Sequence, residues 1–149
     1  MPPEKHALLS ASSAARWMIC TAAPRYEATF PESTSAYAEE GRLAHALCEA
    51  KVRKWNGEIT PRKYRETLKH LQADPLYDPE MEETSEGYLA HLMDRAALFS
   101  RPPAIACEVR VPLTAYVPEG FGTCYCVMIG DDLLAVTDYK HGKGVPVSA

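Results

Sequence analysis

The sequence predicts an α+β fold in which the helical N-terminal two thirds packs on a small antiparallel β-meander. Apolar residues recur at intervals of three and four as far as residue 103, and the period changes to two after it. Helices followed by consecutive strands favour an α+β layer over a doubly wound sheet. Hydrophobic residues make up 46 % and charged residues 24 % of the 149 residues, which is typical of a globular domain. We expect a single domain, mainly helical over residues 1–103 and three-stranded over residues 104–149.

The first two helices are expected from their start signals and apolar spacing. Ser10 or Ser12 is predicted to cap a short helix that runs to Cys20, and prolines interrupt the segment that follows it. A long helix is predicted over residues 35–55, and Asn56-Gly57 is its stop signal. We expect its buried stripe to consist of Leu43, Ala44, Leu47, Ala50 and Val52.

Two further helices begin with a capping side chain followed by proline at the first helical position. Thr60-Pro61 opens a helix that runs to Ala73, and Asp78-Pro79 opens another that stops before Arg101-Pro102-Pro103. The apolar face of the last helix is expected to comprise Tyr88, Leu89, Leu92 and Leu98.

Three strands are predicted after Pro103. Residues 104–111 alternate in a way that puts one apolar and one charged set on opposite faces. Residues 121–129 and 133–138 are two further strands, and Gly130-Asp131-Asp132 between them is typical of a tight hairpin turn. The three strands therefore form an antiparallel meander.

Charge is unevenly distributed along the chain. The net charge of −4 argues against indiscriminate nucleic-acid binding over the whole surface. Seven basic residues nevertheless lie between Lys51 and His70, and seven acidic residues without Lys or Arg lie between Asp74 and Asp94. Two interpretations stay open: two solvated helix faces, or a basic strip for phosphates beside an acidic strip that repels them or meets a basic partner.

The cysteine count and the apolar pattern bear on the compartment. Five cysteines are an odd number, and no signal-peptide core or membrane-spanning apolar stretch accompanies them. We therefore expect reduced thiols, a cytoplasmic protein and no membrane partner.

A short acid–base pattern ends the last predicted strand. The hairpin places Tyr125 opposite Thr137 or Asp138, and Asp138 and Lys140 lie two residues apart. Side chains two apart on a strand leave the same face, so the carboxylate and the ammonium are neighbours. Such a pair either holds a divalent cation and a polarised water or forms a surface ion pair.

Three segments carry a resemblance to a known superfamily. They are SASSAARWMIC (residues 10–20), EEGRLAH (39–45) and FGTCYCVMIGDDLLAVTDYKHGKG (121–144). Together they resemble the RecB-like branch of the PD-(D/E)XK nucleases. The chain looks most like a phage and prophage family in that branch, related to the CRISPR-associated and recombination exonucleases.

The resemblance implies a partial PD-(D/E)XK core with a metal-dependent site. His45 and Asp138 would ligate Mg²⁺ or Mn²⁺, and Lys140 would support the attacking water. The expected substrate is DNA. The basic residues expected to contact it are Arg62, Lys63, Arg65, Lys69 and Lys143.

The site departs from the family pattern at one ligand. In Gly122-Thr123-Cys124-Tyr125, tyrosine stands where the family has aspartate, and a neutral phenol is a poor ligand for Mg²⁺. Asp131 and Asp132 lie too far along the strand to replace it, which leaves Glu108 as the substitute on a neighbouring strand.

Two other family features are missing from the sequence. The helix that follows the core in the family, with its Q-x-x-x-Y motif, has no counterpart, so we expect a C-terminally truncated form. Some relatives carry an iron–sulfur cluster. Cys20 could stand for its first ligand, but the C-terminal cysteine trio is absent, and no cluster is expected.

The resulting hypothesis is a phage-derived, catalytically impaired exonuclease-like protein that acts by binding nucleic acid or a host complex. One alternative is a phage-encoded inhibitor of a host defence complex, of the anti-CRISPR type. A second alternative is an active metal-dependent DNA exonuclease. A homodimer that covers the exposed sheet is a further hypothesis, which a monomeric mass in light scattering would contradict.

Overall fold

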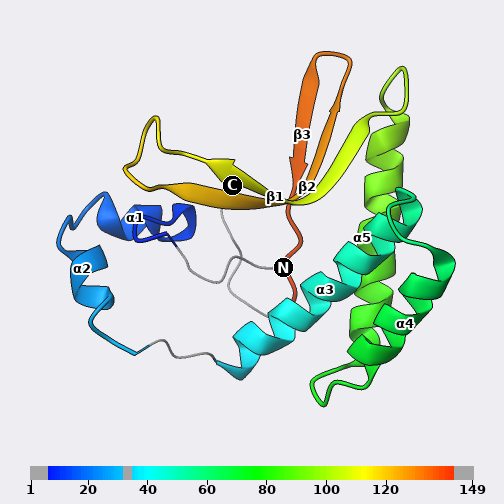
Figure 1. The fold of residues 1–149 in the computed structure, drawn as a ribbon, viewed down its shortest axis with the longest axis horizontal. Helices are drawn as coiled ribbons and strands as arrows, with labels where there is room; N and C mark the ends of the chain where they lie inside the picture. Colours follow the sequence, from blue (N-terminus) through cyan, green and yellow to red (C-terminus); the bar gives the residue numbers. More distant parts are fainter. Residues whose placement is uncertain (1–6, 32–34, 143–149) are drawn as a thin grey trace. The chain divides into compact units, whose positions relative to one another are not determined.

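A computed structural model describes residues 7–31 and 35–142 and has the predicted α+β fold, with helices first and an antiparallel sheet after them (Figure 1). Among these residues the helices are η1 (Ala11–Ser13), α1 (Ala14–Trp17), α2 (Ala23–Glu27), α3 (Ala36–Trp55), α4 (Pro61–Gln72) and α5 (Pro79–Ala97). The strands are β1 (Ala104–Pro112), β2 (Phe121–Gly130) and β3 (Leu133–Thr137). No helix of the described residues is long and apolar enough to cross a membrane.

The chain divides into two compact units, and the division falls inside β1 and β2. The first unit comprises residues 1–33 and 108–124, which include η1, α1 and α2. The second comprises residues 34–107 and 125–149, which include α3, α4, α5 and β3. The single domain predicted for the whole chain stays a prediction.

Each of the three long helices begins at a capping side chain, and two of the three, Thr60 and Asp78, are the predicted ones. The Ser35 side chain accepts a hydrogen bond from the Ala38 N–H, and the Thr60 side chain accepts one from the Lys63 N–H. The Asp78 carboxylate does the same for the Glu80 N–H, at 2.7 Å. Each cap satisfies a backbone donor that has no partner inside its helix.

Helix α3 packs against α4 and α5 and supplies more buried residues to the second unit than any other element. All five residues of its predicted stripe are buried. Two clusters make up this core. The first contains Leu43, Ala44, Leu47, Cys48, Met81 and Tyr139, and the second contains Val52, Leu92, Cys126, Met128 and Ala135.

The predicted apolar face of α5 is wrong at its last residue. Leu92 is fully buried, but the side chain of Leu98 is 78 % exposed. Helix α5 ends at Ala97, so Leu98 no longer follows the helical face. Phe99 packs against the second core cluster in its place.

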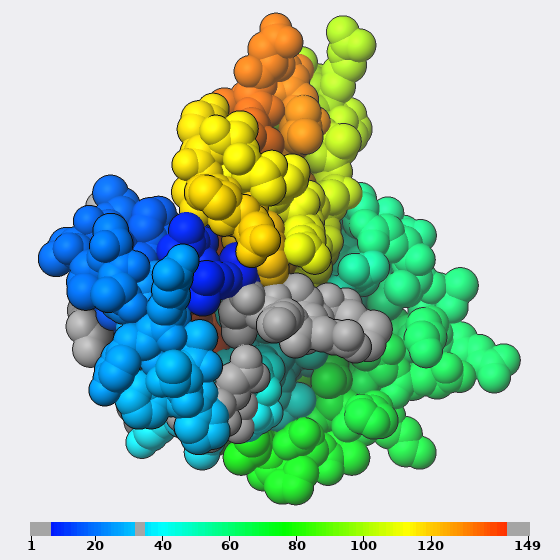
Figure 2. Space-filling view, turned by 60° about the vertical axis from the view of Figure 1, so that its left-hand side comes forward, coloured from blue at the N-terminus to red at the C-terminus, as the bar shows by residue number. Residues whose placement is uncertain are grey.

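The β2–β3 hairpin has a two-residue turn. The register runs from Cys126 opposite Thr137 to Gly130 opposite Leu133. Asp131 and Asp132 have φ values of 50° and 59°, as a type I′ turn requires. The Asp131 carboxylate accepts hydrogen bonds from the backbone and the hydroxyl of Ser100, and the hairpin tip (orange) lies beside the end of α5 in Figure 2.

The N-terminal helix is shorter than predicted. It ends at Trp17 rather than Cys20, and the Ser10 side chain makes no capping hydrogen bond. The Ser10 hydroxyl instead lies 2.7 Å from the Ser13 hydroxyl. Helix α2 lies in the segment that prolines are expected to interrupt. Pro24 instead lies in the first turn of this helix, where proline is tolerated.

Candidate functional site

The predicted site residues His45, Asp138 and Lys140 come together with Tyr125 in the second unit. His45 lies on α3, Tyr125 lies on β2, and the other two follow the end of β3. Extending the hairpin register by one residue sets Tyr125 level with Asp138, as predicted. The strand itself ends at Thr137, one residue earlier than expected.

An aromatic stack joins α3 to β2. The rings of His45 and Tyr125 are nearly parallel, with centroids 4.0 Å apart and an interplanar angle of 22°. Tyr139 approaches the same imidazole edge-on, with centroids 5.4 Å apart. The ring of His45 therefore contacts two phenols, and Tyr125 covers one of its faces.

The acid–base pair forms on the predicted common face. The Lys140 Nζ lies 2.7 Å from the Asp138 Oδ2, and the two side chains are 63 % and 41 % exposed, respectively. An exposed ion pair of this kind contributes little to stability, about 0.2–1 kcal/mol. The same Nζ lies 6.0 Å from the centroid of the Tyr125 ring. The pair thus borders the aromatic stack and faces solvent.

The electrostatic surroundings favour a neutral His45. Burial lowers the pKa of His45 most, and the positive charge of Lys140 and of a protonated His141 lowers it further. Asp138 opposes this shift, and the pKa stays below its ordinary value. A neutral imidazole offers a lone pair to a ligand, whereas a protonated one does not.

The donor set does not make a complete site for a hard divalent cation. Within residues 7–31 and 35–142, no three His, Cys, Asp or Glu side chains are arranged to hold a metal ion. His45 and Asp138 supply two donors, and the third position holds the phenol of Tyr125. Asp131 bonds to Ser100, and Glu108 as the substitute ligand stays a prediction.

A hydrogen-bonded chain that the sequence did not predict lies behind the acid–base pair. The Tyr139 hydroxyl donates to the Thr84 Oγ1 at 2.8 Å and lies 3.1 Å from the His141 Nδ1. The His141 Nε2 lies 3.4 Å from a Glu40 oxygen. Tyr139 is buried, while Asp138 and Lys140 on either side of it are exposed. These hydrogen bonds therefore anchor the segment that carries Asp138 and Lys140. The alternation of a strand could have predicted that Tyr139, between these two exposed residues, is buried.

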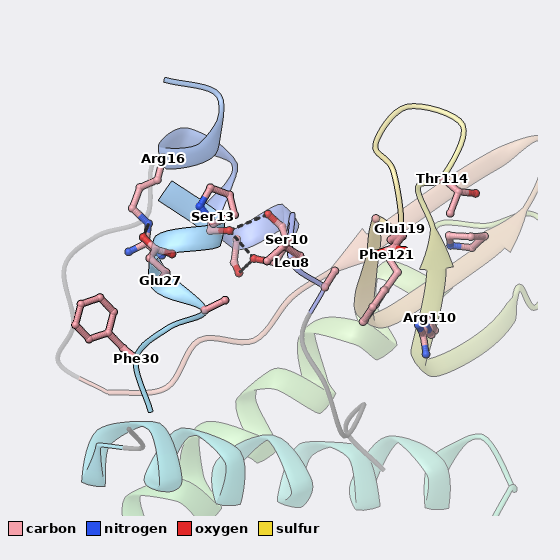
Figure 3. Close-up of a pocket in the computed structure, with 16 residues that line it drawn as sticks. Leu8, Ser10, Ser13, Arg16, Glu27, Phe30, Arg110, Thr114, Glu119 and Phe121 are labelled. Atoms are coloured by element: carbon pink, nitrogen blue, oxygen red, sulfur yellow. Dashed lines mark hydrogen bonds and ion pairs between the residues drawn. The ribbon is translucent and has the colours of Figure 1, made fainter. Parts of the chain in front are cut away.

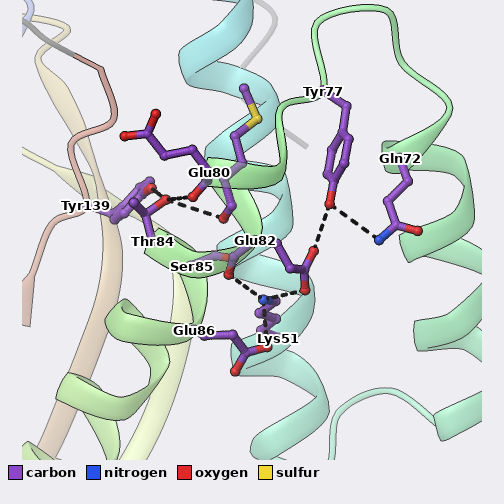
Figure 4. Close-up of polar contacts among 10 residues, drawn as sticks. Lys51, Gln72, Tyr77, Glu80, Glu82, Thr84, Ser85, Glu86 and Tyr139 are labelled. Atoms are coloured by element: carbon purple, nitrogen blue, oxygen red, sulfur yellow. Dashed lines mark hydrogen bonds and ion pairs between the residues drawn. The ribbon is translucent and has the colours of Figure 1, made fainter.

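The acidic and basic runs meet inside the fold. Lys51 of α3 is buried, and its Nζ lies 2.8 Å from Glu82 and 2.7 Å from Glu86 on α5 (Figure 4). It also donates to the Glu82 carbonyl at 3.2 Å. Burial acts to lower the pKa of Lys51, but the hydrogen bonds and charges of the two carboxylates outweigh it, and the pKa is raised. Lys51, Glu82 and Glu86 therefore belong neither to a solvated helix face nor to a charged strip that contacts a partner.

The predicted nucleic-acid contacts on α4 are exposed. Arg62 forms an ion pair with Glu66, at 3.0 Å. In the part of the chain that the structure describes, no ion pair involves Lys63, Arg65 or Lys69. The last predicted contact, Lys143, lies outside the described residues.

Fold and site together define an α+β protein in which a histidine, a tyrosine and an exposed acid–base pair meet at the base of a hairpin. A family described as "Protein of unknown function (DUF2800)" matches residues 6–149. The chain belongs to this family. No solved structure matches the chain. The resemblance to the PD-(D/E)XK nucleases and the phage origin stay predictions.

Proposed function

We propose that this protein is a catalytically impaired relative of the PD-(D/E)XK nucleases that acts by binding nucleic acid. The observation that carries the proposal is the grouping of His45, Asp138 and Lys140, with Tyr125 stacked on the histidine. Three of the four positions keep residue types suited to phosphodiester chemistry. The fourth holds a phenol in contact with the imidazole.

The impairment follows from the chemistry of the donors. Hydrolysis of a phosphodiester by this class of site needs a metal ion to activate water and to stabilise charge on the phosphate. Mg²⁺ and Mn²⁺ prefer carboxylate oxygens, and the phenol of Tyr125 is neutral at pH 7. One carboxylate and one imidazole therefore hold such an ion weakly.

Binding without cleavage is supported by cations of the second unit. Lys140 is 63 % exposed in its side chain, and Lys63, Arg65 and Lys69 lie exposed on α4. Lysine and arginine side chains bind phosphates and release counterions, a contribution that needs no metal. Loss of the metal ligand therefore leaves the attraction for the nucleic-acid backbone intact.

The experiment is a gel-shift titration of labelled double-stranded DNA in EDTA. We expect binding that weakens by at least about tenfold between about 50 and 200 mM salt. Lys63→Ala combined with Arg65→Ala should weaken it further, whereas Arg25→Ala, an exposed arginine of the first unit, is the matched control. Absence of binding at the lower salt concentration would contradict the proposal.

A protein partner is the second candidate, and one observation favours it. The side chains of Ile129, Leu134 and Val136 are 56 %, 61 % and 54 % exposed on the hairpin. The register places them on one face, the same one as Tyr125. An exposed apolar face of this kind suits a protein surface, such as a host nucleic-acid-processing complex that the chain inhibits. Ile129→Lys should abolish binding to such a partner and leave the gel shift unchanged.

A further inference from the structure

The first unit contains a cavity of about 1360 Å³ (Figure 3). It lies between the N-terminal helical segment and the connection from β1 to β2. None of the residues of the candidate site lines it. Small-molecule pockets have volumes of about 300–1,000 Å³, so this open cavity suits an extended ligand.

Hydroxyl groups and an ion pair line one wall. The Ser10 hydroxyl lies 2.7 Å from the Ser13 hydroxyl and 3.2 Å from the Ser12 hydroxyl. Arg16 and Glu27 form an exposed ion pair at 3.4 Å. This wall therefore offers several hydrogen-bond donors with little net charge.

The opposite wall carries a cation on an aromatic ring. The Arg110 guanidinium lies 3.7 Å from the centroid of the Phe121 ring. No ion pair of Arg110 forms within the described residues. A guanidinium stacked on a ring keeps its N–H donors at the edge of its plane, where they bind a phosphate.

A second aromatic group lies at the cavity. Phe30 lines it and is 56 % exposed, and its ring packs edge-on against Tyr26, with centroids 5.1 Å apart. An exposed ring and an arginine therefore line the same cavity, and proteins that bind single-stranded nucleic acid combine such rings, which stack on bases, with cations along the backbone. A duplex keeps its bases stacked inside and cannot use such rings. Glu27 and Glu119 also line the cavity, which disfavours a ligand as densely charged as a duplex.

We propose that this cavity binds a short single-stranded nucleic-acid segment, with a phosphate on Arg110 and a base stacked on Phe30. The ligand is a nucleic acid, as in the proposed function, and the inference rests on that function only for this class of ligand. The residues are different and belong to the other compact unit.

The test is fluorescence anisotropy of the full chain with a labelled oligothymidylate of about six nucleotides, in EDTA. Arg110→Ala and Phe30→Leu should each weaken binding by about tenfold, since one phosphate contact or one stacked base is lost. Arg110→Lys keeps the charge without the flat guanidinium and should recover only part of the affinity. Arg25→Ala removes an arginine of α2 that does not line the cavity, and it should bind as the natural protein does. All three positions are exposed, and thermal unfolding checks that each of the four variants folds.

The same variants separate this proposal from the proposed function. Lys63→Ala combined with Arg65→Ala should weaken duplex binding and leave the oligothymidylate bound. No oligothymidylate binding at about 100 μM protein, or equal binding by Arg110→Ala and the natural protein, overturns the cavity proposal. Duplex binding that persists in that case leaves the proposed function standing. Oligothymidylate binding that depends on Arg110, without any duplex binding or any effect of the α4 variant, supports the cavity and overturns the α4 surface.

Discussion

The imidazole of His45 lies 4.0 Å from the phenol of Tyr125, ring against ring, where an acid–base pair follows the end of β3. The stack joins a helix to a strand and covers one face of the histidine. The same contact that stabilises the junction between α3 and β2 puts a neutral ring where a carboxylate would complete a metal site.

Tyr125→Asp should raise the affinity for Mn²⁺ by at least about tenfold, because a second carboxylate joins Asp138 and His45. Isothermal titration calorimetry measures the change. Tyr125→Phe is the matched control, since it keeps an aromatic ring and adds no charge. Equal Mn²⁺ affinities for Tyr125→Asp and Tyr125→Phe would mean that position 125 does not face the ion.

The pKa of His45 should lie below its ordinary value of 6.5, because burial disfavours the imidazolium. The unfolded chain then binds more protons than the folded chain, so His45 makes stability fall as pH drops below about 6.5. NMR titration of the imidazole reports the pKa directly. Lys140→Ala should raise it and Asp138→Asn should lower it; shifts of the opposite signs would contradict the described electrostatics.

Lys51→Ala should lower the free energy of unfolding by about 2–3 kcal/mol, through lost packing and a broken ion pair. Glu82 and Glu86 stay partly exposed, at 35 % and 60 % of their side chains, which keeps the loss below that of a fully buried pair. Arg62→Ala removes a side chain that is 86 % exposed and paired with Glu66, and it should cost no more than about 0.5 kcal/mol. Urea denaturation compares the two, and equal losses would refute the buried role of Lys51.

Tyr139→Phe should destabilise the protein by about 1 kcal/mol, because the hydroxyl loses its bond to Thr84. Thr84→Val removes the other partner. If the bond is as described, the double variant loses less than the sum of the two single losses, with a coupling of at least about 0.5 kcal/mol. Full additivity of the two losses would show that the hydroxyls do not interact.

Asp132→Gly should stabilise the protein by about 0.5–1 kcal/mol, because Asp132 has a φ of 59° that glycine adopts without strain. Asp94→Gly is the matched control within helix α5, where glycine should destabilise by a similar amount. Thermal unfolding distinguishes the two signs. A loss of stability at Asp132 would count against the type I′ turn.

The long helices were predictable because their start signals are local. Thr60-Pro61 and Asp78-Pro79 each combine a side-chain acceptor with a residue that fits the first turn, and neither depends on the rest of the fold. The hairpin register followed in the same way from Asp131 and Asp132. Helix α2 could not be predicted, because proline disrupts the interior of a helix but is also common in its first turn.

The site was predictable only as far as strand alternation reaches. A period of two puts Asp138 and Lys140 on one face and Tyr139 on the other, as the structure has them. The partner of Tyr139 is Thr84, on a helix 55 residues earlier in the chain, and no local pattern joins them.

The burial of Lys51 could likewise not be predicted from a local pattern in the sequence. A lysine in a basic run gives no sign of burial, and its carboxylate partners lie on α5, whose packing against α3 decides the outcome. Some residues of the two charge runs therefore pair with one another inside the fold, and only the others form a charged surface. The α4 cations and Lys54 are exposed members of the basic run.

The most direct test of the account is a cleavage assay on labelled single- and double-stranded DNA with Mn²⁺. It compares the natural protein, Lys140→Ala, Tyr125→Asp, Tyr125→Phe, and Tyr125→Asp combined with Lys140→Ala. We expect cleavage by Tyr125→Asp alone, because only this variant has both the second carboxylate and the lysine. Cleavage by the natural protein that Lys140→Ala abolishes would contradict the account and would make the protein an active nuclease.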